Sequence, residues 1–150
     1  MTTLDADTAF ELVDRLGHAY ALFDEATYDL ASAVGLSSAE LVAMVVLASM
    51  GSALSQSEWG RLQGVTRQRA HVVANALVQK GLVARTRVGR ESQIALTVEG
   101  KRESRRLRAN MGRAAQRRLG AMPTKQATQL HALLGALVET LEATRELDPG

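Results

Sequence analysis

Residues 66–90 concentrate side chains that can bond to the bases and phosphates of a nucleic acid. Arg can donate two parallel hydrogen bonds to guanine, and Gln or Asn can pair in a similar bidentate way with adenine. A Thr at the start of a helix can offer the free N–H groups of the first turn to a phosphate. The candidate DNA contacts are Thr66, Arg67, Gln68, Arg69, His71, Asn75, Arg85, Arg87 and Arg90.

The charge of the chain is divided unevenly between this region and the rest. Residues 61–118 hold 15 of the 18 Lys and Arg residues and three acidic residues, which gives a net charge of +12. The other 92 residues sum to −10, so the total of +2 conceals a strongly polarised molecule. A basic segment of this size is typical of a surface that meets a polyanion. None of the five aromatic residues lies in it. Since single strands are usually gripped by stacking on aromatic rings, the composition favours duplex DNA.

Two short helices joined by a tight turn are predicted at the start of the basic segment. Ser55 opens the first with the spacing of a capping box, and Thr66 is placed to cap the second. Gly60 would let the two helices cross closely, and Gly64 suits the turn. This order is typical of a helix–turn–helix, whose second helix enters the major groove.

A β-hairpin is predicted directly after these helices. Its strands are expected over Leu82–Val88 and Glu91–Thr97, joined by the two-residue loop Gly89-Arg90. Gly at the first loop position favours a type II′ turn. The crowding of three Arg residues on one hairpin favours an anionic partner over a simple solvated face.

A long amphipathic helix is predicted over residues 7–34, ahead of this region. Its apolar stripe recurs every three or four residues, with one polar gap, at Val13, Leu16, Tyr20, Phe23, Thr27, Leu30 and Val34. A helix this long exceeds the radius of a small domain, so we expect part of the stripe to pack on a second chain.

Three further helices complete the prediction. Ser37 opens one that is apolar nearly all round and ends near Met50, so it should be buried. Thr97 caps another that reaches about Leu119, and Pro123 precedes a last, leucine-rich helix. The predicted fold class is therefore mainly α with a small β-hairpin wing, in one domain of residues 1–150.

The span from Leu54 to Gly100 resembles the winged helix–turn–helix of the MarR family of bacterial regulators. The likeness rests on the run Leu77-Val78-Gln79-Lys80-Gly81-Leu82-Val83 and on Leu96-Thr97-Val98-Glu99-Gly100, which matches the family's LTxxG motif. It implies a DNA-binding lobe over about 37–97, long dimerisation helices over about 7–34 and 98–147, and an Arg90 that enters the minor groove. One departure is Val88, which stands where the family's wing often has the Asp that orients this Arg.

These observations together predict a homodimeric, sequence-specific transcriptional repressor that binds a pseudo-palindromic duplex. The family resemblance implies a small apolar or aromatic effector, for which Met44 and Met50 are candidate wall residues. Two alternatives stay open. One is a non-specific architectural DNA binder. The other is a protein-interaction module that kept the fold and lost DNA binding.

Other classes of function find little support in the sequence. No catalytic triad, phosphate-binding glycine loop or pair of catalytic carboxylates stands out, so we do not expect an enzyme or a cofactor. The three His residues lack ligand spacing, which argues against a metal site. The chain has no Cys, its polar N-terminus is unlike a signal peptide, and no apolar run has membrane-spanning length. We therefore expect a cytoplasmic protein with no membrane partner.

Overall fold

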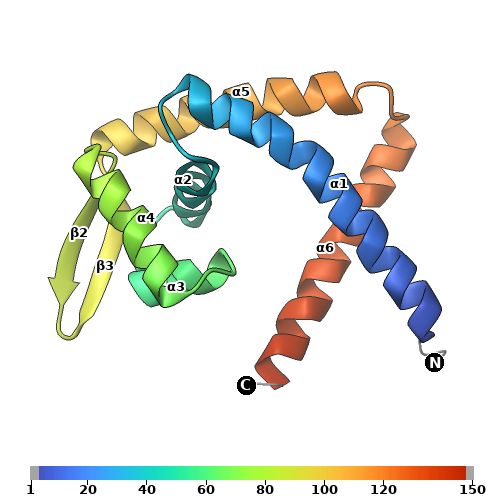
Figure 1. The fold of residues 1–150 in the computed structure, drawn as a ribbon, viewed down its shortest axis with the longest axis horizontal. Helices are drawn as coiled ribbons and strands as arrows, with labels where there is room; N and C mark the ends of the chain where they lie inside the picture. Colours follow the sequence, from blue (N-terminus) through green and yellow to red (C-terminus); the bar gives the residue numbers. More distant parts are fainter. Residues whose placement is uncertain (1–3, 148–150) are drawn as a thin grey trace. The chain divides into compact units, whose positions relative to one another are not determined.

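The computed structural model describes residues 4–147 and is mainly helical (Figure 1). It divides into two compact units whose boundary falls after Gly112, so the long helix α5 belongs partly to each. The elements are α1 (Ala6–Ala33), α2 (Ser38–Met50), β1 (Leu54–Ser55), α3 (Gln56–Leu62), α4 (Arg67–Gln79), β2 (Val83–Val88), β3 (Glu91–Leu96), α5 (Val98–Leu119) and α6 (Thr124–Leu147). The predicted fold class is confirmed, and the helix boundaries agree with the prediction to within one or two residues.

Local capping chemistry sets where the helices of the first unit begin. Ser37 and Glu40 form the full capping box: the Glu40 N–H donates to Ser37 Oγ at 3.2 Å, and the Ser37 N–H donates to Glu40 Oε2 at 2.9 Å. The predicted box at Ser55 is only half formed. Its hydroxyl accepts from the Glu58 N–H at 3.1 Å, and among the described residues the Glu58 side chain returns no bond. One satisfied N–H is still enough to start the short helix α3.

The hairpin predicted from sequence is part of a three-stranded antiparallel sheet with the order β1-β3-β2. The register pairs Val83 with Leu96 at one end of the hairpin and Val88 with Glu91 at the other. Gly89 has φ +62°, whereas no non-glycine residue within 4–147 has a positive φ. This combination fits the predicted type II′ turn and excludes type I′, which needs two positive φ values. The strand β1 was not predicted, because two residues are too few to show alternation.

The hydrophobic core of the first unit is built around α2, as its uniformly apolar sequence predicts. Leu41 and Met44 of this helix are fully buried, together with Leu77 of α4 and Ile94 of β3. Trp59 of α3 is also fully buried, and its indole N–H donates to the Ala43 carbonyl of α2 at 3.3 Å. The single Trp therefore fixes the first helix of the helix–turn–helix to the core.

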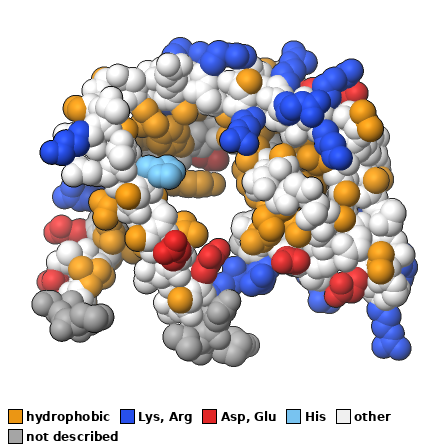
Figure 2. Space-filling view, turned by 180° about the vertical axis from the view of Figure 1, so that it is seen from behind, with side chains coloured by type: hydrophobic (Ala, Val, Ile, Leu, Met, Phe, Trp, Pro, Cys, Tyr) orange, Lys and Arg blue, Asp and Glu red, His pale blue; other side chains and the backbone are white. Residues whose placement is uncertain are grey.

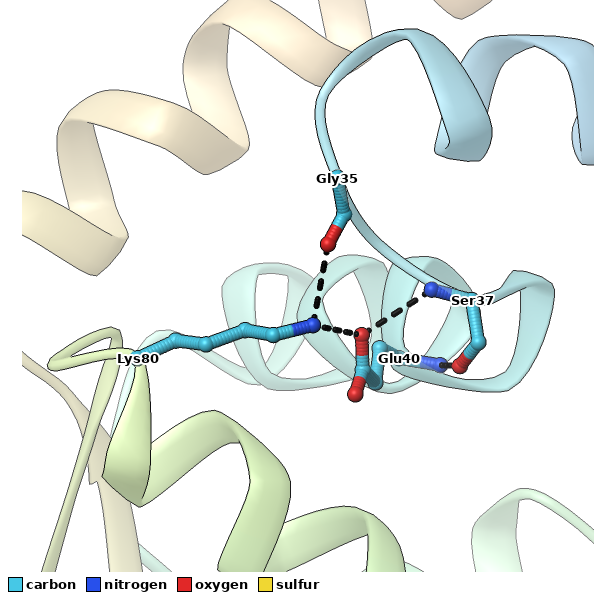
Figure 3. A network of polar contacts seen from close by, with 4 residues as sticks. All are labelled: Gly35, Ser37, Glu40 and Lys80. Atoms are coloured by element: carbon cyan, nitrogen blue, oxygen red, sulfur yellow. Dashed lines mark hydrogen bonds and ion pairs between the residues drawn. The ribbon is translucent and has the colours of Figure 1, made fainter.

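Lys80, at the C-terminal end of α4, ties this helix to the turn between α1 and α2 (Figure 3). Its ammonium donates to the Gly35 carbonyl at 2.9 Å and to Glu40 Oε2 at 2.6 Å. The same carboxylate oxygen accepts from Ser37, so one Glu side chain serves both as a helix cap and as an ion-pair partner. Because Glu40 is only 7% exposed, this ion pair is better shielded than an ordinary surface pair.

The two long terminal helices expose much of their apolar surface. In α1 only the last turns pack on the core, through Ala31 and its neighbours, whereas Val13 and Tyr20 earlier in the stripe are 67% and 70% exposed. In α6 the large apolar residues that are exposed are Leu130, Leu133, Leu134, Val138 and Leu141. Within residues 4–147 no single helix is long and apolar enough to cross a membrane, and α1 with α2 meets that test only as a pair bent by 91°.

Candidate nucleic-acid interface

A helix–turn–helix forms where the sequence predicts it, from α3, the turn at Gly64 and α4. Gly64 has φ +65°, a conformation that side chains rarely adopt. A methyl group at Gly60 would lie 3.0 Å from Cβ of Ala70, so the absence of a side chain there lets α3 and α4 cross closely. Thr66 caps α4, and its hydroxyl accepts from the Arg69 N–H at 3.2 Å. The Arg69 N–H is therefore already bonded within the chain. Among the described residues, no side chain accepts a hydrogen bond from the N–H groups of Arg67 and Gln68.

Helix α4 presents one buried face and one polar face. Its inner side consists of Ala70, Val73, Ala74 and Leu77, all buried. The predicted DNA contacts at its N-terminal end, Arg67, Gln68 and Arg69, are exposed. Their separation from the inner face follows from the 3.6-residue period of the helix.

Asn75 and His71, two further predicted contacts, are joined to the wing in a network of four side chains. Arg85 of β2 donates to Asn75 Oδ1 at 2.7 Å and to Gln56 Oε1 at 3.0 Å. These bonds turn both amide NH₂ groups toward the His71 ring, with Asn75 Nδ2 3.1 Å from Nε2 and Gln56 Nε2 3.4 Å from Nδ1. Since a neutral imidazole has one acceptor nitrogen, it can accept only one of these two bonds at a time.

This network joins three elements that are distant in sequence: the start of α3, the flank of α4 and the base of the wing. Arg85 is half-buried, and its Nε atom is buried without a hydrogen-bond partner. Both of its partners are neutral amides, so the network leaves its positive charge uncompensated. Gln56 was not singled out from the sequence, because nothing in the periodicity relates it to a residue 29 positions away.

Arg87 and Arg90, the other two wing residues, are exposed farther along the hairpin. Arg87 pairs in register with Ser92, and Arg90 lies in the loop at the tip. Val88, where the MarR wing often has Asp, pairs with Glu91 and is 62% exposed. Figure 2 shows Lys and Arg side chains distributed over the part of the molecule that holds the wing, on the right of that view.

A cavity of about 330 Å³ lies in the same unit, between the C-terminal end of α2, β3 and the first half of α5. Apolar groups of Leu47, Ala48 and Leu96 contribute to its wall, and the basic side chains that line it are Lys101, Arg105 and Arg108. The two predicted wall residues are placed elsewhere. Met44 is fully buried in the core, Met50 is exposed, and neither lines this cavity.

The overall structure is similar to solved structures of bacterial regulators. It superposes on a MarR family protein from Bacillus stearothermophilus with a TM-score of 0.77 and 17% identity, covering 93% of this chain and 99% of that one. CouR from Rhodococcus jostii RHA1 bound to p-coumaroyl-CoA gives 0.71 and 23%, covering 91% and 95%. NadR in complex with 4-hydroxyphenylacetate gives 0.79 and 16%, covering 89% and 98%.

The chain has the MarR-family fold. At sequence level, no family model and no curated protein matches it. The MarR fold therefore rests on the arrangement of the helices, sheet and wing, and the residue-level motifs quoted above agree with it.

Proposed function

We propose that this protein is a homodimeric, cytoplasmic transcriptional regulator that binds duplex DNA in a sequence-specific manner and acts as a repressor. The observation that carries the proposal is the exposed run Arg67-Gln68-Arg69 at the start of the second helix of a helix–turn–helix. These side chains carry the donors and acceptors that distinguish base pairs in the major groove. The two exposed wing arginines, Arg87 and Arg90, lie in the same unit and supply charge for the flanking phosphates or the minor groove.

A homodimer is supported by the exposed apolar surfaces of α1 and α6. A soluble chain rarely leaves so many large apolar residues in contact with water along two long helices. Pairing with a second copy would cover them and place two recognition helices about a two-fold axis, which matches a pseudo-palindromic site. Light scattering at micromolar concentration tests this, and a stable folded monomer of 16.1 kDa would contradict it.

The DNA-binding proposal is tested by selecting duplexes from a random pool and measuring their affinity for purified variants. Arg69→Ala should relax preference at one base position, at a cost of about 1–3 kcal/mol there. Arg117→Ala, near the C-terminal end of α5, removes the same charge from the other compact unit and serves as the matched control. If Arg69→Ala weakens binding to every sequence equally, base reading by this residue is wrong. Binding without enrichment of any sequence would indicate an architectural protein, and no binding would indicate an interaction module.

We also propose that the 330 Å³ cavity takes an effector that lowers DNA affinity. Its apolar wall and three basic side chains suit an apolar organic anion, such as an aromatic acid. No carboxylate within residues 4–147 forms an ion pair with Lys101, Arg105 or Arg108, so their charge is available to a ligand. The ligand-bound NadR and CouR structures support a small-molecule site in proteins of this fold. The cavity touches β3 of the wing, which gives a bound ligand a direct route to the DNA-binding surface.

The effector proposal is tested with a thermal-shift screen of aromatic acids, followed by DNA titration with each hit. A coupling of roughly 1–3 kcal/mol would loosen DNA binding about five- to 150-fold, and DNA would weaken the ligand by the same factor. Arg105→Ala should reduce the shift, whereas Arg117→Ala, which lies outside the cavity lining, should not. A ligand that stabilises the protein but leaves DNA affinity unchanged would contradict regulation through this site.

A further inference from the structure

Val72 is an exposed valine in the middle of the polar face of α4. It is 61% exposed and lies opposite the inner face that contains Ala70 and Val73. Gln68 lies four residues before it, so the two side chains are neighbours on the same ridge of the helix. A single exposed valine is common on protein surfaces, but this one occupies the centre of the surface that would enter the major groove.

The side-chain network described above makes this position more significant. On the flank of α4 next to Val72, the Asn75 carbonyl oxygen is held by Arg85 and its NH₂ group faces His71. The Asn75 side chain is therefore engaged at both its oxygen and its NH₂ group, and His71 accepts one of the two amide hydrogen bonds directed at its ring. Val72 and the side chains at the N-terminal end of α4 are exposed and take no part in this network.

Valine cannot exchange hydrogen bonds with a base, and it brings two methyl groups to the groove. The apolar group that base pairs present in the major groove is the C5-methyl of thymine. Packing a methyl group against valine removes both from water, and it rewards thymine over cytosine or uracil at that position. A phosphate or a minor-groove edge would give an exposed valine no comparable gain.

We propose that Val72 is a specificity-determining residue that reads the 5-methyl group of one thymine in each half-site. This inference rests on the proposed sequence-specific binding of duplex DNA. It separates two kinds of base reading on one helix: hydrogen bonding by Gln68 and Arg69, and methyl contact by Val72.

The test is a methyl-deletion scan of a duplex selected from the random pool. Each thymine is replaced in turn by deoxyuridine, which removes the methyl group and keeps the Watson–Crick pairing. One symmetric pair of positions should be sensitive in the wild-type protein. Loss of one buried methyl should weaken binding about fourfold, and loss of both should weaken it roughly 15-fold.

The same scan with Val72→Ala identifies the protein partner of the methyl group. This variant should bind thymine and uracil duplexes within about twofold of each other at the sensitive positions, a limit set by the small methyl contact that alanine still makes. Val98→Ala, at a valine that is 88% exposed on α5, should keep the wild-type sensitivity. Since alanine is a better helix former than valine and the site is exposed, Val72→Ala should fold normally, which circular dichroism checks.

Two results would overturn the inference while leaving the proposed function intact. One is a selected duplex with no uracil-sensitive position in the wild-type protein. The other is a sensitive position that stays equally sensitive in Val72→Ala, since the methyl group would then be read by another residue. A protein that enriches no sequence would overturn the proposed function, and this inference with it.

Discussion

Gly100→Ala should destabilise the protein, although alanine is normally favoured over glycine in a helix. Gly100 lies in the first turn of α5 and is buried. A methyl group there would overlap the carbonyl oxygen of Leu82 and would lie 2.9 Å from its carbonyl carbon. Because the obstacle is backbone, no side-chain rotation can relieve the clash. Either α5 or the start of β2 must move.

The change in the free energy of unfolding follows from two destabilising contributions and one stabilising contribution. Overpacking of a well-packed site typically costs about 1–3 kcal/mol. A displaced Leu82 carbonyl also weakens the 3.1 Å hydrogen bond that it accepts from the Thr97 N–H, which is worth about 0.5–1.5 kcal/mol. The helical preference of alanine returns about 0.8–1.0 kcal/mol. The net loss should therefore be about 1–3 kcal/mol, and each kcal/mol lowers Tm by roughly 2–4 °C in a chain of this size.

Gly112→Ala in the same helix is the matched control, because no atom of residues 4–147 beyond its chain neighbours and the backbone of its own helix lies within 4 Å of the added methyl group. It should raise the free energy of unfolding by up to about 1 kcal/mol. Both variants are compared with the wild-type protein by urea and thermal unfolding at one protein concentration, since an oligomer's Tm depends on concentration. The reasoning would be refuted if Gly100→Ala were as stable as Gly112→Ala, because α5 could not then approach Leu82 so closely.

Four shorter predictions concern charge. DNA affinity should fall with salt at a log–log slope of about −5 to −9 if a dimer neutralises six to ten phosphates, and a slope near zero would contradict the proposal. Arg90→Ala should weaken binding chiefly at A·T-rich flanks, measured by competition, because the minor groove separates little beyond A·T from G·C. Lys80→Met leaves the carboxylate of Glu40 without its cation and should lower stability by about 1–2 kcal/mol, whereas Lys80→Met combined with Glu40→Leu should recover part of the loss in urea unfolding. The backbone hydrogen bond from Thr8 lowers the pKa of Asp5 below its ordinary 3.8, so the charged cap at the start of α1 is fully present above pH 3.8 and is lost as the pH falls through the lowered pKa; hydrogen-exchange protection factors in the first turn should decrease there in the wild type and not in Asp5→Ala.

The helices and the wing could be predicted because their signals are local. Ser37, Thr66 and Thr97 each accept a hydrogen bond from the N–H three residues later, a pattern that a single turn of sequence contains. Gly89 likewise indicates the hairpin turn, because glycine readily adopts the positive φ that the turn requires. Such features depend on few residues, so tertiary packing did not change them.

The parts that were missed depend on contacts between distant residues. The strand β1 exists only because Leu54 pairs with Ile94, 40 positions later. The bond between Gln56 and Arg85 is of the same kind. A helix that is apolar all round does not show which of its faces lines a cavity, so the sequence could not decide which side chains form the pocket wall.

The contacts of α4 indicate how a movement of one element can be transmitted to others in this fold. Near its middle, the helix is joined to α3 and the wing by the Arg85 network; at its end, Lys80 joins it to the turn that follows α1. A shift of the last turns of α1 is therefore expected to pull on α4 through Lys80, and the Arg85 network would pass the movement on to the wing. In a dimer built on α1, such a shift changes the distance between two recognition helices, and DNA allows only a narrow range of that distance. An effector would then need to move α1 by only a small amount to release the DNA, provided that the bonds of Lys80 to Gly35 and Glu40 are intact.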